Sequence, residues 1–155
     1  ASALPSDGDG GPVWPAGYLG SIAHTRAWAV AIAGATDRWR ALGIDIEDWR
    51  RLQRPGLAQR ILTPEELAAW RNLPAERQTR QLALIFSAKE ALFKAWHPTL
   101  RQPLALRDVA LRADPAPRLI WIRPDLPAPP PFQIRWDCGD ACCLATACVP
   151  AGQTG

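Results

Sequence analysis

The sequence predicts an α+β fold, in which strands and helices occupy separate parts of the chain. Short segments typical of strands lie before residue 48 and after residue 107, with strict alternation at residues 41–47, whereas residues 64–96 carry a helical period. Segregation of this kind is typical of an antiparallel sheet with helices packed on one face. The length of 155 residues is that of one domain with a core of its own.

Composition narrows the class of protein. A hydrophobic content of 48% and a charged content of 21% are typical of a soluble globular chain. The net charge of +3 is too small to indicate a nucleic-acid partner. The longest apolar run, residues 27–33, is far shorter than the ~20 residues of a membrane-spanning helix, and the first residues do not resemble a secretory signal. We therefore expect a cytoplasmic protein without a membrane span.

The first expected elements follow a leader rich in Gly and Pro. Residues 1–12 predict a flexible leader, residues 13–150 the folded domain, and residues 151–155 a short tail. Residues 19–24 and 27–33 predict two strands joined by a tight turn at Thr25-Arg26. His24 lies at this turn, where it is either a solvated surface residue or a ligand contact.

The third expected strand, residues 41–47, places two carboxylates on one face. Its isoleucines are predicted to face the core, so Asp45 and Glu47 share the opposite face with Cα atoms about 6.5 Å apart. Such a pair repels unless a cation lies between the carboxylates, although an edge strand exposed to solvent would tolerate it. With Glu90 added, the set is made of oxygen donors alone, which suits Mg²⁺.

The central region predicts helices. Residues 48–60 are basic and form either a solvated loop or short helix, or a docking surface for an acidic partner. A capping box at residues 63–66 starts a helix that ends near Asn72. The pair Leu73-Pro74 separates it from a long helix over residues 75–96.

The long helix carries two charged residues on a face next to its apolar stripe. Glu90 and Lys94 are four residues apart, which alone indicates an exposed helix pair that contributes about 0.3 kcal/mol. The acidic strand upstream favours a functional interpretation instead, because three carboxylates and one ammonium then lie in two neighbouring segments.

The remaining chain predicts four strands, at residues 108–112, 118–122, 132–137 and 141–149. A polyproline-like connector at residues 124–131 separates the middle two, and a turn at residues 138–140 closes the last hairpin. All four cysteines lie in this last part: Cys138, Cys142, Cys143 and Cys148. They lack the paired spacing of a zinc site, and neighbours on a strand point to opposite faces, so we expect free thiols.

Three segments stand out by their order and spacing: WPAGYLGSIAH at residues 14–24, GIDIE at residues 43–47 and FSAKEALFKA at residues 86–95. They resemble the three signature motifs of phosphopantetheinyl transferases, with a likeness to the enterobactin-synthetase component D branch. The resemblance covers residues 13–150. It implies a phosphopantetheinyl transferase-type α/β half-domain. It also implies Mg²⁺-dependent transfer of 4'-phosphopantetheine from coenzyme A to a serine of an acyl, peptidyl or aryl carrier protein, as in siderophore and other secondary metabolism.

The resemblance also assigns roles to residues. It implies that Mg²⁺ is held against the pyrophosphate by Asp45, Glu47 and Glu90. It implies a coenzyme A site formed by Ser21, His24, Lys89 and Lys94, in which Lys94 neutralises the pyrophosphate. Glu90, directly or through a metal-bound water, would be the base for the carrier serine, which makes Glu90 and Lys94 the expected catalytic pair. The family's usual serine is Ala23 here, so one hydroxyl contact to phosphate is missing.

The second departure concerns the length. Related proteins have an additional N-terminal half, and their active site lies between the two halves. The chain therefore resembles the C-terminal half of such a pseudo-dimer, which would need that half or self-association. Two other hypotheses remain at this point: a non-catalytic remnant that binds a partner, and a Mg²⁺-dependent enzyme that cleaves pyrophosphates with the same carboxylates.

Overall fold

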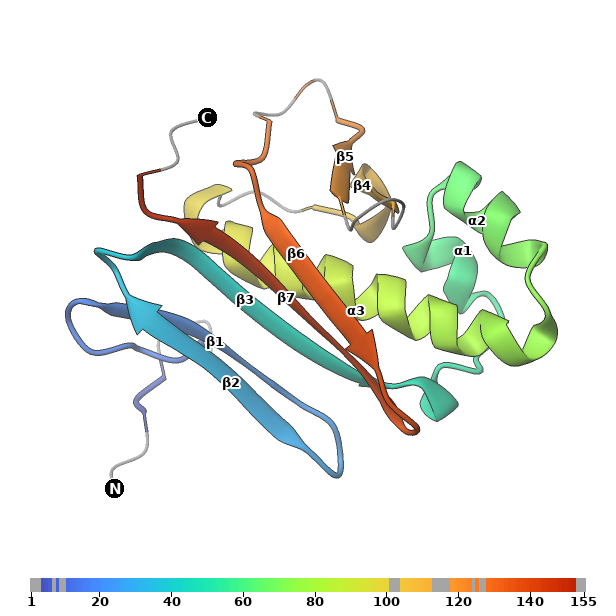
Figure 1. The fold of residues 1–155 in the computed structure, drawn as a ribbon, viewed down its shortest axis with the longest axis horizontal. Helices are drawn as coiled ribbons and strands as arrows, with labels where there is room; N and C mark the ends of the chain where they lie inside the picture. Colours follow the sequence, from blue (N-terminus) through green and yellow to red (C-terminus); the bar gives the residue numbers. More distant parts are fainter. Residues whose placement is uncertain are drawn as a thin grey trace.

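The computed structural model describes residues 4–6, 8, 11–100, 104–112, 118–123, 125 and 128–152. Within this part of the chain, three antiparallel sheets accompany one long helix and shorter helical segments, which confirms the α+β prediction (Figure 1). The predicted leader, the predicted tail and the connector at residues 124–131 each fall partly outside the described residues. No helix in the described ranges combines the length and apolarity needed to cross a membrane.

The first two strands form a hairpin. β1 (Tyr18–His24) pairs with β2 (Ala29–Ala35), from Tyr18 opposite Ala35 to His24 opposite Ala29. The predicted two-residue turn is wrong, since the loop contains residues 25–28. Thr25 explains the longer loop: its backbone amide donates to the Trp28 carbonyl, and its hydroxyl accepts from the amides of Ala27 and Trp28.

The central sheet has the order β3-β7-β6. β3 (Trp39–Asp48) and β6 (Gln133–Cys138) both pair antiparallel with β7 (Cys142–Pro150), which lies between them. Alternate residues of β7 are fully buried, namely Cys143, Ala145, Ala147 and Val149. This buried face is the one that the long helix covers.

The long helix α3 (Ala75–Leu100) crosses the sheet on one face, as Figure 1 shows. It extends four residues past the predicted end at Trp96, although Pro98 in its last turn cannot donate the usual backbone hydrogen bond to the Lys94 carbonyl oxygen. Its buried side chains are small where it meets β3: Ala88, Ala91 and Ala95. A Cβ atom on Gly43 would overlap the Ala91 carbonyl oxygen, so the strand and helix approach more closely than any side chain at residue 43 would allow.

Shorter elements pack beside α3. The basic segment folds into a 3₁₀ turn, η1 (Trp49–Arg51), and a short helix, α1 (Leu57–Ile61). The predicted capping box starts α2 (Pro64–Arg71): Thr63 Oγ1 accepts from the Glu66 amide, and Glu66 Oε2 accepts from the Thr63 amide. The remaining elements are η2 (Leu106–Asp108), β4 (Val109–Arg112) and β5 (Arg118–Trp121), and the two strands pair with each other.

The faces of β3 differ from the prediction. Gly43 and Asp45 face α3, whereas Leu42 lies against Gly34 of the β1–β2 hairpin. By strand alternation, the isoleucines therefore face the hairpin, and the carboxylates face the helix. β3 is buried on both faces, so a solvent-exposed acidic edge is excluded.

The cysteine prediction is wrong for one pair. Cys138 and Cys143 form a disulfide, because the β6–β7 register places them directly opposite each other. Cys142 and Cys148 are free, as expected. Cys143 is fully buried and Cys142 only partly, which agrees with side chains on opposite faces.

We predict that Gly43→Ala lowers the free energy of unfolding by about 3 kcal/mol, because the Ala91 backbone cannot yield to the added methyl group. Chemical denaturation measures the change. Gly139→Ala is the matched control, since the nearest heavy atom to its added Cβ is 4.0 Å away. Equal stability of both variants would contradict the close approach of β3 and α3.

Candidate active site

Three carboxylates and one ammonium gather where β3 meets α3. Asp45 and Glu47 come from the strand, and Glu90 and Lys94 from the helix. Asp45 is only 6% exposed, and its Oδ1 lies 2.7 Å from Lys94 Nζ. Lys94 therefore reaches across to the strand, which differs from the expected exposed pair with Glu90.

A second contact holds the two elements in place. The Ser87 hydroxyl, one helical turn before the charged residues, donates to the Asp45 carbonyl oxygen at 2.9 Å. Ser87 is fully buried, so this hydrogen bond is shielded from water. The strand position that carries Asp45 is thus fixed to the helix through both its backbone and its side chain.

The cluster has an excess of negative charge. Burial raises the pKa of Asp45 even though Lys94 opposes the shift. Burial, followed by repulsion from Asp45 and Glu90, raises the pKa of Glu47 to about 7. The pKa of Glu90 is also raised, first by burial and then by Asp45. One lysine does not balance three carboxylates, so a further cation would stabilise the cluster.

The donor set fits Mg²⁺. Only oxygen ligands are offered, and Asp45 Oδ2 is a buried oxygen without a hydrogen-bond partner. Within the described ranges, however, no three Asp, Glu, His or Cys side chains converge closely enough to ligate one ion. The residues fit the chemistry of the ion, and binding would require their side chains to turn toward a common point.

A cavity of about 550 Å³ opens beside the cluster. It combines one carboxylate of the cluster, Glu47, with basic residues from two segments. Its lining consists of His24, Thr25, Arg26, Glu47, Asp48, Arg51, Leu52, Arg54, Leu57 and Phe86. Guanidinium groups bind phosphate oxygens through paired hydrogen bonds, so this lining suits a phosphorylated ligand.

The arginines of the cavity were not among the predicted site residues. Arg51 and Arg54 belong to the basic segment expected to form a loop or a docking surface, and Arg26 lies in the loop after β1. Arg50 is engaged by Asp48, with Nε 3.0 Å from Oδ1. The run of arginines was the available signal, but only the fold shows that two of them line a cavity that also contains His24.

The remaining predicted residues lie in different places. His24 ends β1, is exposed and lines the cavity. Ser21 is 6% exposed on the buried face of β1 and does not line the cavity. The structure thus brings His24, but not Ser21, to the cavity that Glu47 also lines.

Lys89 lies apart from the cavity. Its side chain is fully buried, and Nζ donates to Glu66 Oε2 at 2.6 Å and to the Ile61 carbonyl oxygen at 2.9 Å. Glu66 also accepts from the Leu111 amide at 2.7 Å, so the ion pair joins α3 to α1, α2 and β4. Burial lowers the pKa of Lys89, and Glu66 opposes that shift. In this conformation the ammonium links α3 to α1 and α2, and it does not line the cavity.

Two family models match the chain. The model described as the 4'-phosphopantetheinyl transferase superfamily matches residues 41–143, and the model described as the 4'-phosphopantetheinyl transferase N-terminal domain matches residues 1–34. The first spans β3, α3 and the paired strands β6 and β7 as far as Cys143.

Individual proteins agree with the models. The chain is 32% identical to the 4'-phosphopantetheinyl transferase Svp of Streptomyces mobaraensis, over 92% of the chain and 62% of that protein. It is 37% identical to the 4'-phosphopantetheinyl transferase PptT of Mycobacterium tuberculosis, over 64% of the chain and 43% of that protein. The chain thus spans less than two thirds of the length of either relative.

A solved structure shares the fold. The holo-(acyl-carrier-protein) synthase of Bacillus anthracis, determined in complex with CoA (3',5'-ADP), superimposes with a TM-score of 0.63 at 23% identity. The match covers 74% of this chain and 99% of that one.

We predict that the Glu47 carboxylate makes stability depend on pH. Because folding raises its pKa from 4.5 to about 7, the stability it contributes is fully present below pH 4.5 and is lost as the pH rises through about 7. Without divalent cations, Glu47→Gln should gain about 1–2 kcal/mol over the parent between acidic and mildly alkaline pH, less than the full linkage value because the side chain is partly solvated. If the free energy of unfolding of the two proteins changed with pH in the same way, the raised pKa of Glu47 in the carboxylate cluster would be contradicted.

Proposed function

Because the chain belongs to the 4'-phosphopantetheinyl transferase superfamily, we propose that it transfers the 4'-phosphopantetheine group of coenzyme A to a serine of an apo carrier protein. The observation that carries the proposal is the carboxylate–lysine cluster between β3 and α3, which adjoins an arginine-lined cavity. Such a site pairs cations for phosphate oxygens with carboxylates for a metal ion and a proton. The coenzyme A complex of the Bacillus anthracis protein supports the choice of donor.

The reaction is a displacement at phosphorus. The carrier serine oxygen attacks the phosphorus attached to pantetheine, and the bond from this phosphorus to the bridging oxygen breaks. Adenosine 3',5'-bisphosphate leaves with that oxygen, and the serine proton passes to a base. Catalysis of this kind depends mainly on positioning and charge neutralisation.

Glu90 is the proposed base. Its carboxylate is partly buried, and its pKa is raised, so it is a stronger proton acceptor than a solvated glutamate. The neighbouring carboxylate on Asp45 contributes to the raised pKa. α3 holds Glu90 on the same helical segment as Lys94, so the base and a cation for the pyrophosphate are presented together.

Mg²⁺, when bound, would neutralise the pyrophosphate charge and polarise the phosphorus that is attacked. The residues that would hold it are Asp45, Glu47 and Glu90. Lys94, His24, Arg51 and Arg54 would bind the phosphate oxygens of coenzyme A. Lys94 would then exchange its ion pair with Asp45 for a phosphate contact, which leaves both Asp45 oxygens to the metal ion.

Two other functions remain to be separated from transfer. A Mg²⁺-dependent pyrophosphate-cleaving enzyme would use the same carboxylates with water in place of serine. A non-catalytic binding protein would leave coenzyme A intact. The products separate them, because only a transferase adds phosphopantetheine to a carrier while it releases adenosine 3',5'-bisphosphate.

The β1–β2 hairpin leaves an apolar surface open next to the site. Tyr18 and Ile22 are 56% and 42% exposed on the face of β1 that ends at His24, and Trp28 in the adjoining loop is 60% exposed. The exposed residues of β2 are Ala29, Ala31 and Ala33, so this face carries no Asp, Glu, Lys or Arg side chain. Apolar surfaces of this kind are usually covered by another polypeptide. We propose that a second copy of the chain covers it and completes the cavity.

We expect Glu90→Gln to lower carrier modification at least 100-fold, since the amide keeps the shape of the side chain but cannot accept the serine proton. Turnover is measured with coenzyme A, Mg²⁺ and an apo carrier by mass spectrometry of the carrier. Glu76→Gln, which changes an exposed residue in the first turn of α3, is the control. Unchanged turnover in Glu90→Gln would remove Glu90 from the mechanism.

The basic segment should contribute to carrier docking outside the cavity and to coenzyme A binding within it. Arg60 is exposed and does not line the cavity, whereas Arg54 does. Arg60→Glu should therefore raise the KM for the carrier about fivefold and leave that for coenzyme A unchanged, because rim charges act on encounter. Arg54→Glu should raise both constants. If Arg60→Glu raised the two constants equally, the docking surface would lie elsewhere.

The chain alone should self-associate through the hairpin surface. Trp28→Ser with Tyr18→Ser removes the two most exposed aromatic side chains and should shift light-scattering mass toward the monomer. Val13→Ser, at an exposed apolar residue outside the hairpin, is the control. A monomeric parent chain that modifies a carrier unaided would contradict the need for a covering surface.

A further inference from the structure

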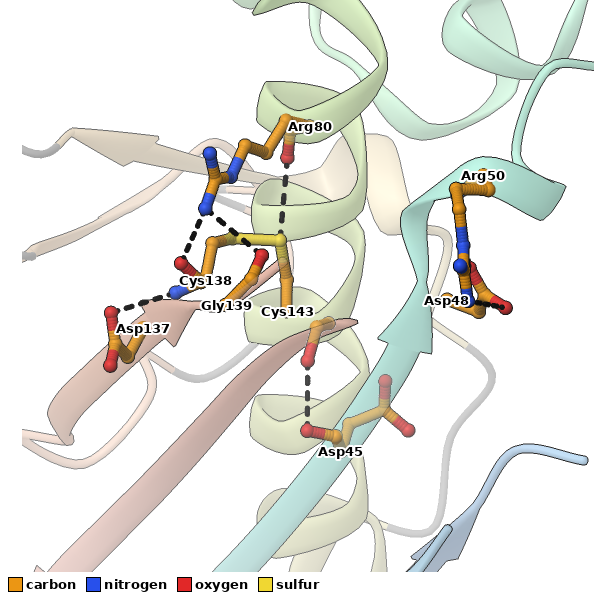
Figure 2. The surroundings of a disulfide bond; sticks show 9 residues. Asp45, Asp48, Arg50, Arg80, Asp137, Cys138, Gly139 and Cys143 are labelled. Atoms are coloured by element: carbon orange, nitrogen blue, oxygen red, sulfur yellow. Dashed lines mark hydrogen bonds and ion pairs between the residues drawn. A yellow bond between two sulfur atoms is a disulfide. The ribbon is translucent and has the colours of Figure 1, made fainter. Parts of the chain in front are cut away.

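The disulfide lies at the turn end of the β6–β7 hairpin, where β7 pairs with the part of β3 that carries Glu47. Cys138 ends β6, Cys143 lies in the second position of β7, and the Gly139 amide closes the turn by donating to the Cys142 carbonyl oxygen. Figure 2 shows the bond beside α3, with Asp45 and Asp48 on the neighbouring strand β3. In the register of β3 and β7, Cys143 lies directly opposite Glu47.

Arg80 of helix α3 forms hydrogen bonds with this end of the hairpin. Its guanidinium donates to the Cys138 and Gly139 carbonyl oxygens at 2.7 and 2.9 Å, as Figure 2 shows. The Arg80 carbonyl oxygen lies 3.5 Å from the Cys143 sulfur. The disulfide is therefore connected to the same helix that presents Glu90 and Lys94.

The disulfide also supports the wall of the cavity. Cys143 is fully buried in a small apolar cluster with Leu52 and Ala83, and Cys138 packs against the same cluster. The other members are Trp49, Leu57, Leu84 and Phe86. Leu52, Leu57 and Phe86 are the apolar residues that line the cavity. The disulfide thus belongs to the same apolar cluster as three side chains that line the cavity.

We propose that the Cys138–Cys143 disulfide is a redox-sensitive device that positions the wall of the cavity, so that the oxidised protein binds its phosphorylated ligand more tightly than the reduced protein. The identity of the ligand as coenzyme A rests on the proposed function; the effect of the disulfide on the cavity wall does not.

The redox step involves only thiol–disulfide exchange. A dithiol supplies two electrons and two protons: the Cys138–Cys143 bond breaks, two thiols form, and the dithiol closes to its own disulfide. The Cys143 thiol can then donate to the Arg80 carbonyl oxygen. The turn between β6 and β7 is then no longer closed by a covalent bond. The apolar cluster that contains Leu52 and Phe86 loses the cross-link between its two cysteines.

The effect must be reciprocal. If the disulfide tightens ligand binding by a given factor, the ligand raises the equilibrium constant for disulfide formation by the same factor. A cross-link that fixes the cavity wall reduces the conformational entropy that the wall loses when the ligand binds. We expect the affinity for coenzyme A to fall about fivefold or more on reduction, within the usual range of coupling between sites.

The experiment uses the whole chain with Cys142→Ser and Cys148→Ser, so that only the pair of interest can react. Mass spectrometry verifies the oxidised and dithiothreitol-reduced states. Calorimetry gives the affinity of each state for coenzyme A, and titration with dithiothreitol redox buffers, with and without coenzyme A, gives the shift of the disulfide equilibrium. Hydrogen exchange of residues 47–57 and 83–87 in both states, without ligand, reports on the cavity wall.

Matching factors for affinity and for the disulfide equilibrium would support the proposal, and equal affinities of the two states would overturn it. If neither state binds coenzyme A, the proposed donor is wrong, and hydrogen exchange decides the inference alone. Faster exchange of the cavity wall after reduction would then support it, and unchanged exchange would overturn it. Failure of the pair to oxidise in the folded chain would also overturn it.

Discussion

The contact of Gly43 with Ala91 sets the distance between the central sheet and its helix. No side chain separates β3 from α3 at this point, and the buried helix residues around it are alanines. At this separation Lys94 reaches Asp45, and Ser87 reaches the Asp45 carbonyl oxygen. The polar cluster is therefore a consequence of an apolar constraint, the close packing of two backbones.

The same proximity makes the cluster electrostatically costly. Three carboxylates share one lysine in a partly dry region, and burial is the largest cause of the raised pKa of each. A structure maintained for stability alone would place apolar residues there. Charges kept against such a cost are common at functional sites, where a ligand supplies the missing countercharge.

The sequence predicted the positions of the helices and strands better than it predicted the contacts between them. Alternation and the capping box located the strands and α2 to within a few residues, since both signals are local, and the three motifs identified the superfamily, which the family models confirm. The face of β3 that meets α3, the partner of Lys94 and the burial of Lys89 depend on contacts between distant segments. The Cys138–Cys143 bond likewise depends on a strand register that spacing does not reveal.

Transfer itself is tested most directly by incubating the protein with coenzyme A, Mg²⁺ and a set of apo carrier proteins, and measuring the mass of each carrier together with the released nucleotide. The account predicts that a carrier serine gains the mass of one phosphopantetheine group, with one adenosine 3',5'-bisphosphate released for each carrier modified. Nucleotide release without carrier modification would identify a hydrolytic enzyme instead. Coenzyme A that stays intact with every carrier, under conditions in which the protein binds it, would contradict transfer altogether.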